Sequence, residues 1–134
     1  VWRGRVGCEV GWRVFLQKDL VRHIGWLEAS VIVGRVWFRW HLPLWTIKSP
    51  QSAIPVWLFG AHCMAYSVII GAAYTLSNGS LVPAVLIHLT VNLASSFAVY
   101  TGFREAELWF RVSAIPYALI AVCAIGLVFM KTGQ

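Results

Sequence analysis

Two pairs of polar residues in this chain have the spacing of side chains that share one face of a helix. Glu9 and Arg13 are four residues apart, and so are His88 and Asn92. Side chains at this spacing lie next to each other on a helix and can act on one spot. A carboxylate held by an arginine can act as a general base, and an imidazole beside an amide can donate hydrogen bonds to an oxyanion. The residue types therefore point to hydrolysis.

His41 is the third candidate, and with Glu9 it could activate a water molecule. The same glutamate, with His41 and His88, could instead hold a divalent metal such as zinc that activates the water. Spacing does not choose between these mechanisms. Each pair also has a structural interpretation, as an ion pair that stiffens a helix or as a hydrogen bond between helices. His62 has no polar companion at helical spacing, and we predict a packed or interhelical histidine there.

The elements that carry these residues are predicted to be membrane helices. The chain has 134 residues, of which 59% are hydrophobic and 12% are charged, whereas about a quarter are charged in ordinary soluble domains. No Lys, Arg, Asp or Glu occurs from Ser49 to Phe103, a gap with room for two spans of about 20 residues. We therefore predict an all-α, polytopic membrane helix bundle that forms a single domain over residues 1–134.

About four transmembrane helices are predicted, preceded by an amphipathic interfacial helix. The spans are residues 26–45, 53–76, 81–100 and 112–130. Residues 1–25 form a basic interfacial segment, and their basic side chains favour a cytoplasmic N-terminus. The net charge of +6 is not gathered into a patch with interleaved aromatic residues, so we predict lipid and not nucleic acid as a partner. The cysteines, Cys8, Cys63 and Cys123, have neither a disulfide pattern nor metal-ligand spacing.

Three motifs, in this order, resemble those of the CPBP family of intramembrane proteases, which includes type II CAAX prenyl endopeptidases and bacterial Abi proteins. The first family motif, EExxxR, reads CEVGWR at residues 8–13. The second, FxxxH within WxxWHLPL, reads WFRWHLPL at residues 37–44. The third, HxxxN, reads HLTVN at residues 88–92 and follows GSLVPA at residues 79–84. Each motif alone is weak, but three in order with their surroundings are specific.

The resemblance implies an intramembrane endopeptidase of bacterial inner membranes that cuts a peptide or prenylated protein substrate. By this resemblance His41 helps to activate water, His88 and Asn92 hold the oxyanion, and Arg13 fixes the helix that bears Glu9. Family members have been described both as metalloproteases and as enzymes with a glutamate-activated water, so zinc bound by Glu9, His41 and His88 stays open. The resemblance does not give the oligomeric state.

The chain departs from the family pattern at Cys8, where the first of two adjacent glutamates is expected to be the base. Glu9 matches only the second glutamate, and neighbouring residues on a helix point about 100° apart. A thiol with a pKa near ~8.5 is a poor base. Either Glu9 reaches the site by a small rotation of its helix, or the protein is a weakened or inactive member that acts as a membrane-bound immunity or scaffold protein.

Two further departures concern the first span and the length of the chain. Arg35 and Arg39 lie on the side of their helix opposite His41, so we predict that they point away from the site. Family members have more helices before the first motif, and residues 1–7 are too few to span a membrane. The chain is therefore predicted to lack N-terminal helices of the family.

Overall fold

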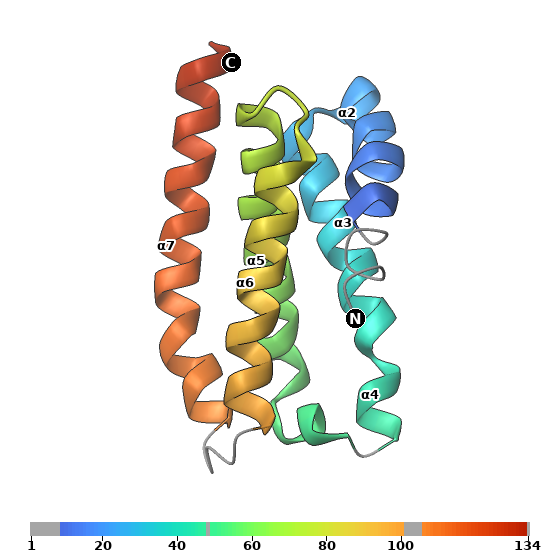
Figure 1. Cartoon of the computed structure of the whole chain (residues 1–134), viewed down its shortest axis with the longest axis vertical. Coiled ribbons are helices and arrows are strands. Elements are labelled where there is room, and N and C mark those ends of the chain that lie inside the picture. The colour runs from blue at the N-terminus through green and yellow to red at the C-terminus, as the bar shows by residue number, and fades with distance from the viewer. Residues whose placement is uncertain (1–8, 48, 101–105, 134) are drawn as a thin grey trace.

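The computed structural model describes residues 9–47, 49–100 and 106–133, and all regular structure in these ranges is helical. The elements are η1 (Val10–Gln17), α2 (Lys18–Ile24), α3 (Trp26–His41), α4 (Pro43–Thr46), η2 (Pro50–Ala53), α5 (Val56–Leu76), α6 (Leu81–Tyr100) and α7 (Ala106–Thr132). The long helices α3, α5, α6 and α7 run alternately down and up the molecule (Figure 1). The prediction of an all-α helix bundle is confirmed.

Local sequence signals set the ends of these helices. Gly25 separates α2 from α3 with a φ of 86°, and Asn78 and Gly79 join α5 to α6 with φ values of 55° and 85°. Glycine adopts this left-handed conformation readily, and asparagine tolerates it better than most residues. Pro43 and Pro50 each stand at the start of a short helix, α4 and η2, where the missing N–H of proline is not needed.

Three helices, α5, α6 and α7, are long and apolar enough to cross a membrane. The span predicted over residues 26–45 is divided between α3, which has 16 residues, and the four-residue α4. A helix that crosses the hydrocarbon core needs about 20 residues, and α3 is not among the three. Each long helix bonds its own backbone N–H and C=O groups, as lipid requires. The chain is therefore a polytopic membrane protein.

The central helix of the bundle is α5, which packs against α3, α6 and α7. Half of its most apolar window is buried, against 22% for α6 and 11% for α7, so α6 and α7 leave most of their surface for lipid. Three buried clusters follow α5 from end to end: Trp26 with Ala72 and Val128, Trp37 with Tyr66 and Val91, and Ile54 with Leu58 and Phe110. The cluster of Trp37 lies at the level of the candidate site.

The N-terminal segment turns its polar side toward the bundle. Glu9, Arg13 and Gln17 are at most 2% exposed, whereas Phe15 is 69% exposed. The interfacial helix predicted over residues 1–25 would instead keep its polar side in water. The arrangement differs because α3 and α5 supply polar partners for these side chains. Lys18 is exposed, as are the other described basic residues of this segment apart from Arg13.

Candidate active site

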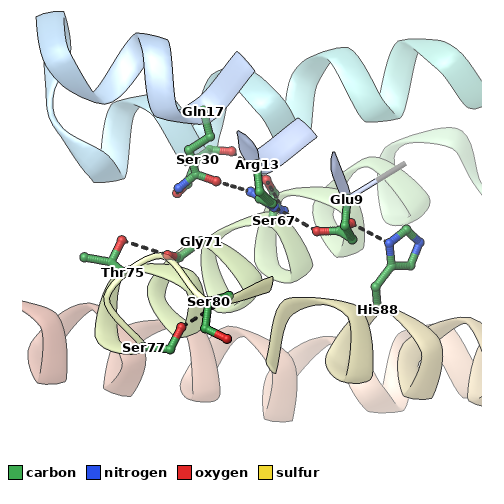
Figure 2. Close-up of polar contacts among 10 residues, drawn as sticks. All are labelled: Glu9, Arg13, Gln17, Ser30, Ser67, Gly71, Thr75, Ser77, Ser80 and His88. Atoms are coloured by element: carbon green, nitrogen blue, oxygen red, sulfur yellow. Dashed lines mark hydrogen bonds and ion pairs between the residues drawn. The ribbon is translucent and has the colours of Figure 1, made fainter. Parts of the chain in front are cut away.

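A buried row of polar side chains starts at Glu9 and runs along η1 (Figure 2). Arg13 Nε donates a hydrogen bond to Glu9 Oε2 at 3.1 Å. The other carboxylate oxygen, Oε1, lies 2.5 Å from Nδ1 of His88 on α6, across a separation of 79 residues in the chain. One carboxylate therefore joins the residues of the first and third motifs.

The Arg13 guanidinium has further partners in the same row. Nη1 donates to Gln17 Oε1 at 2.5 Å, and Nη2 lies 3.5 Å from the Ser67 hydroxyl on α5. Gln17 Nε2 in turn donates to the Ser30 hydroxyl on α3 at 3.1 Å. Burial lowers the pKa of the guanidinium and the Glu9 carboxylate opposes that shift, but arginine remains protonated in proteins. A buried charge is tolerated when it is paired and hydrogen-bonded in this way.

The row fits against α5 because residue 71 is a glycine. A Cβ atom built at Gly71 would clash with the Ser30 hydroxyl and would lie 2.9 Å from Gln17 Nε2. A residue without a side chain is therefore required where η1 and α3 approach α5.

A cavity of about 100 Å³ lies between α3, α5 and α6 and reaches α4, η2 and α7. Its polar lining includes His41, Gln51, His62, Tyr66, Asn92 and Ser95, and aromatic rings form much of the remainder. None of its lining residues in the described ranges is Lys, Arg, Asp or Glu. The cavity is therefore polar in places but carries no permanent charge from these side chains.

Trp37 connects the cavity with the buried ion pair. Its ring lines the cavity, and its centroid lies 6.0 Å from that of His41 and 5.0 Å from that of His88. Both imidazoles therefore pack against one indole. Of the predicted site residues, Glu9, Arg13 and His88 are in direct contact, while His41 and Asn92 lie on the cavity wall.

Both imidazoles use Nδ1 in a hydrogen bond. His41 Nδ1 lies 2.8 Å from the carbonyl oxygen of Trp37, and a carbonyl can only accept, so Nδ1 carries the proton. In neutral His41 the other nitrogen, Nε2, is then free to accept a proton. His88 Nδ1 faces a carboxylate oxygen and donates in the same way. The arrangement can therefore supply a base at His41 and a positioned imidazole at His88.

No three His, Cys, Asp or Glu side chains within the described ranges are grouped so that they could hold a metal ion. Glu9, His41 and His88 therefore do not form a group of three metal ligands in these ranges. Cys8, which stands at the first glutamate position, lies outside the described residues.

Comparison with known families identifies the family of the chain. The sequence pattern of the type II CAAX prenyl endopeptidase Rce1-like family matches residues 5–94, about two-thirds of the 134 residues. The chain belongs to this family. It is a protease family, so the resemblance to intramembrane proteases is confirmed, and the match contains all three motifs. No curated protein and no solved structure matches the chain.

Two predictions about residues near the motifs of this Rce1-like chain are confirmed. His62 is buried and links helices, because its Nδ1 lies 2.9 Å from the Leu58 carbonyl and its Nε2 lies 3.0 Å from the Ser113 hydroxyl on α7. Arg35 and Arg39 are exposed, whereas the Trp37 side chain is buried toward the site.

Sequence reasoning missed three members of the polar row: Gln17, Ser30 and Ser67. Gln17 follows Arg13 by four residues, so the spacing that pairs Glu9 with Arg13 could have found it. Ser30 and Ser67 come from other helices and have no spacing signal. Their place in the row depends on how η1 packs against α3 and α5.

Proposed function

We propose that the chain is an intramembrane endopeptidase that hydrolyses a peptide bond in a membrane-associated, prenylated substrate. The observation that carries this proposal is the 2.5 Å contact between Glu9 and His88, which unites two motifs of a protease family in a buried site. The adjoining cavity is lined by His41 of the second motif and Asn92 of the third. Family membership supports the substrate class.

In this proposal His41 is the general base. Its Nδ1–H is held by the Trp37 carbonyl, so Nε2 takes a proton from a water molecule as the water oxygen bonds to the scissile carbonyl carbon. The imidazolium then gives this proton to the leaving nitrogen as the C–N bond breaks. One water is consumed, and the products are a new carboxyl end and a new amino end.

Asn92 and His88 stabilise the oxyanion of the intermediate. The Asn92 amide donates from its NH₂ group, and His88 adds a donor through Nε2 when both of its ring nitrogens are protonated. Glu9 has both oxygens engaged, so we assign it a positioning role: it orients His88, and Arg13 holds the carboxylate. This role differs from the base expected for the glutamate, and it requires no rotation of the helix.

The test is cleavage of a prenylated peptide by the full chain in proteoliposomes. His41→Ala is expected to lower kcat by about 10²–10⁴-fold through loss of the base, and Asn92→Ala by about 10²–10³-fold through loss of an oxyanion donor. Leu93→Ala is the matched control, because Leu93 is next to Asn92 in the chain and 57% exposed, and it should leave kcat unchanged.

A non-catalytic role, as a membrane-bound immunity or scaffold protein, is the second candidate. Cys8 at the first glutamate position favours it, since no free carboxylate remains in the described part of the first motif. Cys8→Glu separates the two candidates. Cleavage by this variant alone would identify a weakened protease, whereas cleavage by neither chain would exclude the endopeptidase and leave the non-catalytic role.

A further inference from the structure

Two buried side-chain polar atoms in the described part of the chain have no hydrogen-bond partner, the Tyr66 hydroxyl and Gln51 Oε1. Both residues line the same cavity, and Tyr66 is only 4% exposed. An unpaired buried polar group destabilises a fold, and such groups are rare in native proteins. Their gathering on one cavity indicates that the cavity receives a ligand with complementary polar groups.

The Tyr66 hydroxyl is placed by the packing of its ring. The ring belongs to the cluster with Trp37 and Val91 and makes edge contacts with Tyr117 at 4.7 Å and His62 at 5.6 Å between centroids. These contacts come from α3, α5, α6 and α7. The hydroxyl is therefore held in place with Ser95 and Tyr117 as its polar neighbours, and it makes no hydrogen bond to either.

The Gln51 amide is placed by a hydrogen bond at its other end. Nε2 donates to the Tyr100 hydroxyl at 3.1 Å, which leaves Oε1 as an unused acceptor on the cavity wall. Gln51 lies on η2, before the start of α5, whereas Tyr66 lies ten residues after the start of α5 at Val56. The two groups therefore come from different elements and serve separate positions on the cavity wall.

The chemistry of the wall identifies the class of ligand. Besides the groups assigned to catalysis, the wall carries the unpaired Tyr66 hydroxyl and the unpaired carbonyl oxygen of Gln51, and its described lining has no Lys, Arg, Asp or Glu to balance a charge. A peptide main chain is neutral, and each peptide unit has one C=O acceptor and one N–H donor. The volume of about 100 Å³ equals about three water molecules at ~30 Å³ each, which suits a short stretch of main chain.

We propose that Tyr66 and Gln51 bind the main chain of the substrate, with Tyr66 donating to a peptide carbonyl and Gln51 accepting from a peptide N–H. The identity of the peptide as a substrate rests on the proposed function. The binding itself is independent of catalysis, because neither residue takes part in the proton transfers assigned to His41.

The test is equilibrium binding of a fluorescent prenylated peptide to the full chain in nanodiscs, in a His41→Ala background that slows turnover. Tyr66→Phe and Gln51→Met keep the size of each side chain, and each removes one proposed hydrogen bond to the peptide, so each should raise Kd about 3–10-fold. Gln51→Met also removes the bond from Nε2 to the Tyr100 hydroxyl, which Tyr100→Phe removes without touching the Gln51 acceptor. Tyr74→Phe is the matched control, because it removes a hydroxyl from the same helix outside the cavity lining, and it should leave Kd unchanged.

N-methylation of the peptide, one amide at a time, identifies the partner of Gln51. One methylated analogue should bind the parent chain about 3–10-fold more weakly but should bind Gln51→Met no more weakly than the unmethylated peptide does. Thermal unfolding of each variant verifies that the fold is intact.

The outcomes separate this inference from the proposed function. Unchanged Kd values for both cavity variants would overturn the inference even if the protein cleaves peptides. Weaker binding by both variants, with no cleavage by the parent chain or by Cys8→Glu, would support the peptide-binding site. The same result would exclude the proposed endopeptidase activity. A peptide that does not bind at all would overturn both.

Discussion

The surroundings of an ion pair decide its contribution, and this chain contains two pairs that differ mainly in burial. Glu9 and Arg13 are joined at 3.1 Å and are at most 2% exposed. Glu107 and Arg111 have the same i, i+4 spacing, but their side chains are 43% and 53% exposed. An exposed pair contributes about 0–1 kcal/mol, whereas loss of one partner from a buried pair leaves an uncompensated charge.

Glu9→Gln is therefore expected to destabilise the fold by about 3–5 kcal/mol, because Arg13 would remain buried without its counter-charge. The matched change Glu107→Gln should cost less than about 1 kcal/mol. Thermal unfolding of both variants in detergent micelles compares them directly. Similar shifts in Tm for the two variants would mean that the buried row does not depend on the Glu9 charge.

Sequence predicted part of this site and could not predict the remainder. The i, i+4 rule pairs Glu9 with Arg13 and places His88 beside Asn92, because both relations are local. The contact between Glu9 and His88 joins residues 79 positions apart, so it depends on how η1 packs against the bundle. The engagement of both Glu9 oxygens, which changes its proposed role from base to positioning residue, depends on the same packing.

At the scale of elements, the close approach of η1, α3 and α5 depends on one glycine. Gly71→Ala would place a methyl group against Ser30 and Gln17, and we expect the overpacking to cost about 1–3 kcal/mol. Gly126→Ala on α7 is the control, since no atom lies within 4 Å of a Cβ built there. It should be neutral or stabilising by up to about 1 kcal/mol, because alanine favours a helix over glycine.

Unfolding in detergent, followed by circular dichroism, measures both glycine variants. A Gly71→Ala protein as stable as Gly126→Ala would contradict the tight packing of the three elements. The additional change Ser30→Ala removes the hydroxyl that the new methyl group would meet first, so it should restore part of the lost stability.

The long helices can be predicted from sequence because each one is a long stretch of mostly apolar residues. The span predicted over residues 81–100 coincides with α6, Leu81–Tyr100. The span predicted over residues 53–76 corresponds to α5, which begins three residues later at Val56. The last helix is longer than its predicted apolar span because it begins at Ala106 and includes the Glu107–Arg111 pair. The π-helical winding of η1 has no comparable signal in the sequence, although such windings often occur at functional sites.

For the whole molecule, the distribution of basic residues leads to a prediction of orientation. Helix α2, which begins at Lys18, and the C-terminal end of α7, which includes Lys131, lie at the same end of the bundle as the turn between α5 and α6 (Figure 1). Lys131 Nζ donates to the carbonyl of Leu76 at 2.7 Å, at the C-terminal end of α5. Basic residues accumulate on the cytoplasmic side of membrane proteins, so we predict that this end faces the cytoplasm.

Labelling with a membrane-impermeant maleimide tests this orientation in a chain whose cysteines, Cys8, Cys63 and Cys123, are replaced by alanine. Ser80→Cys, in the turn after α5, should react in inside-out vesicles and be protected in right-side-out vesicles. Ser52→Cys, exposed on η2 at the opposite end, should give the reverse pattern. The opposite result for both positions would mean that the protein has the opposite orientation in the membrane. Because Gln51 on the cavity wall precedes Ser52, the same measurement identifies the membrane face nearest to that end of the cavity.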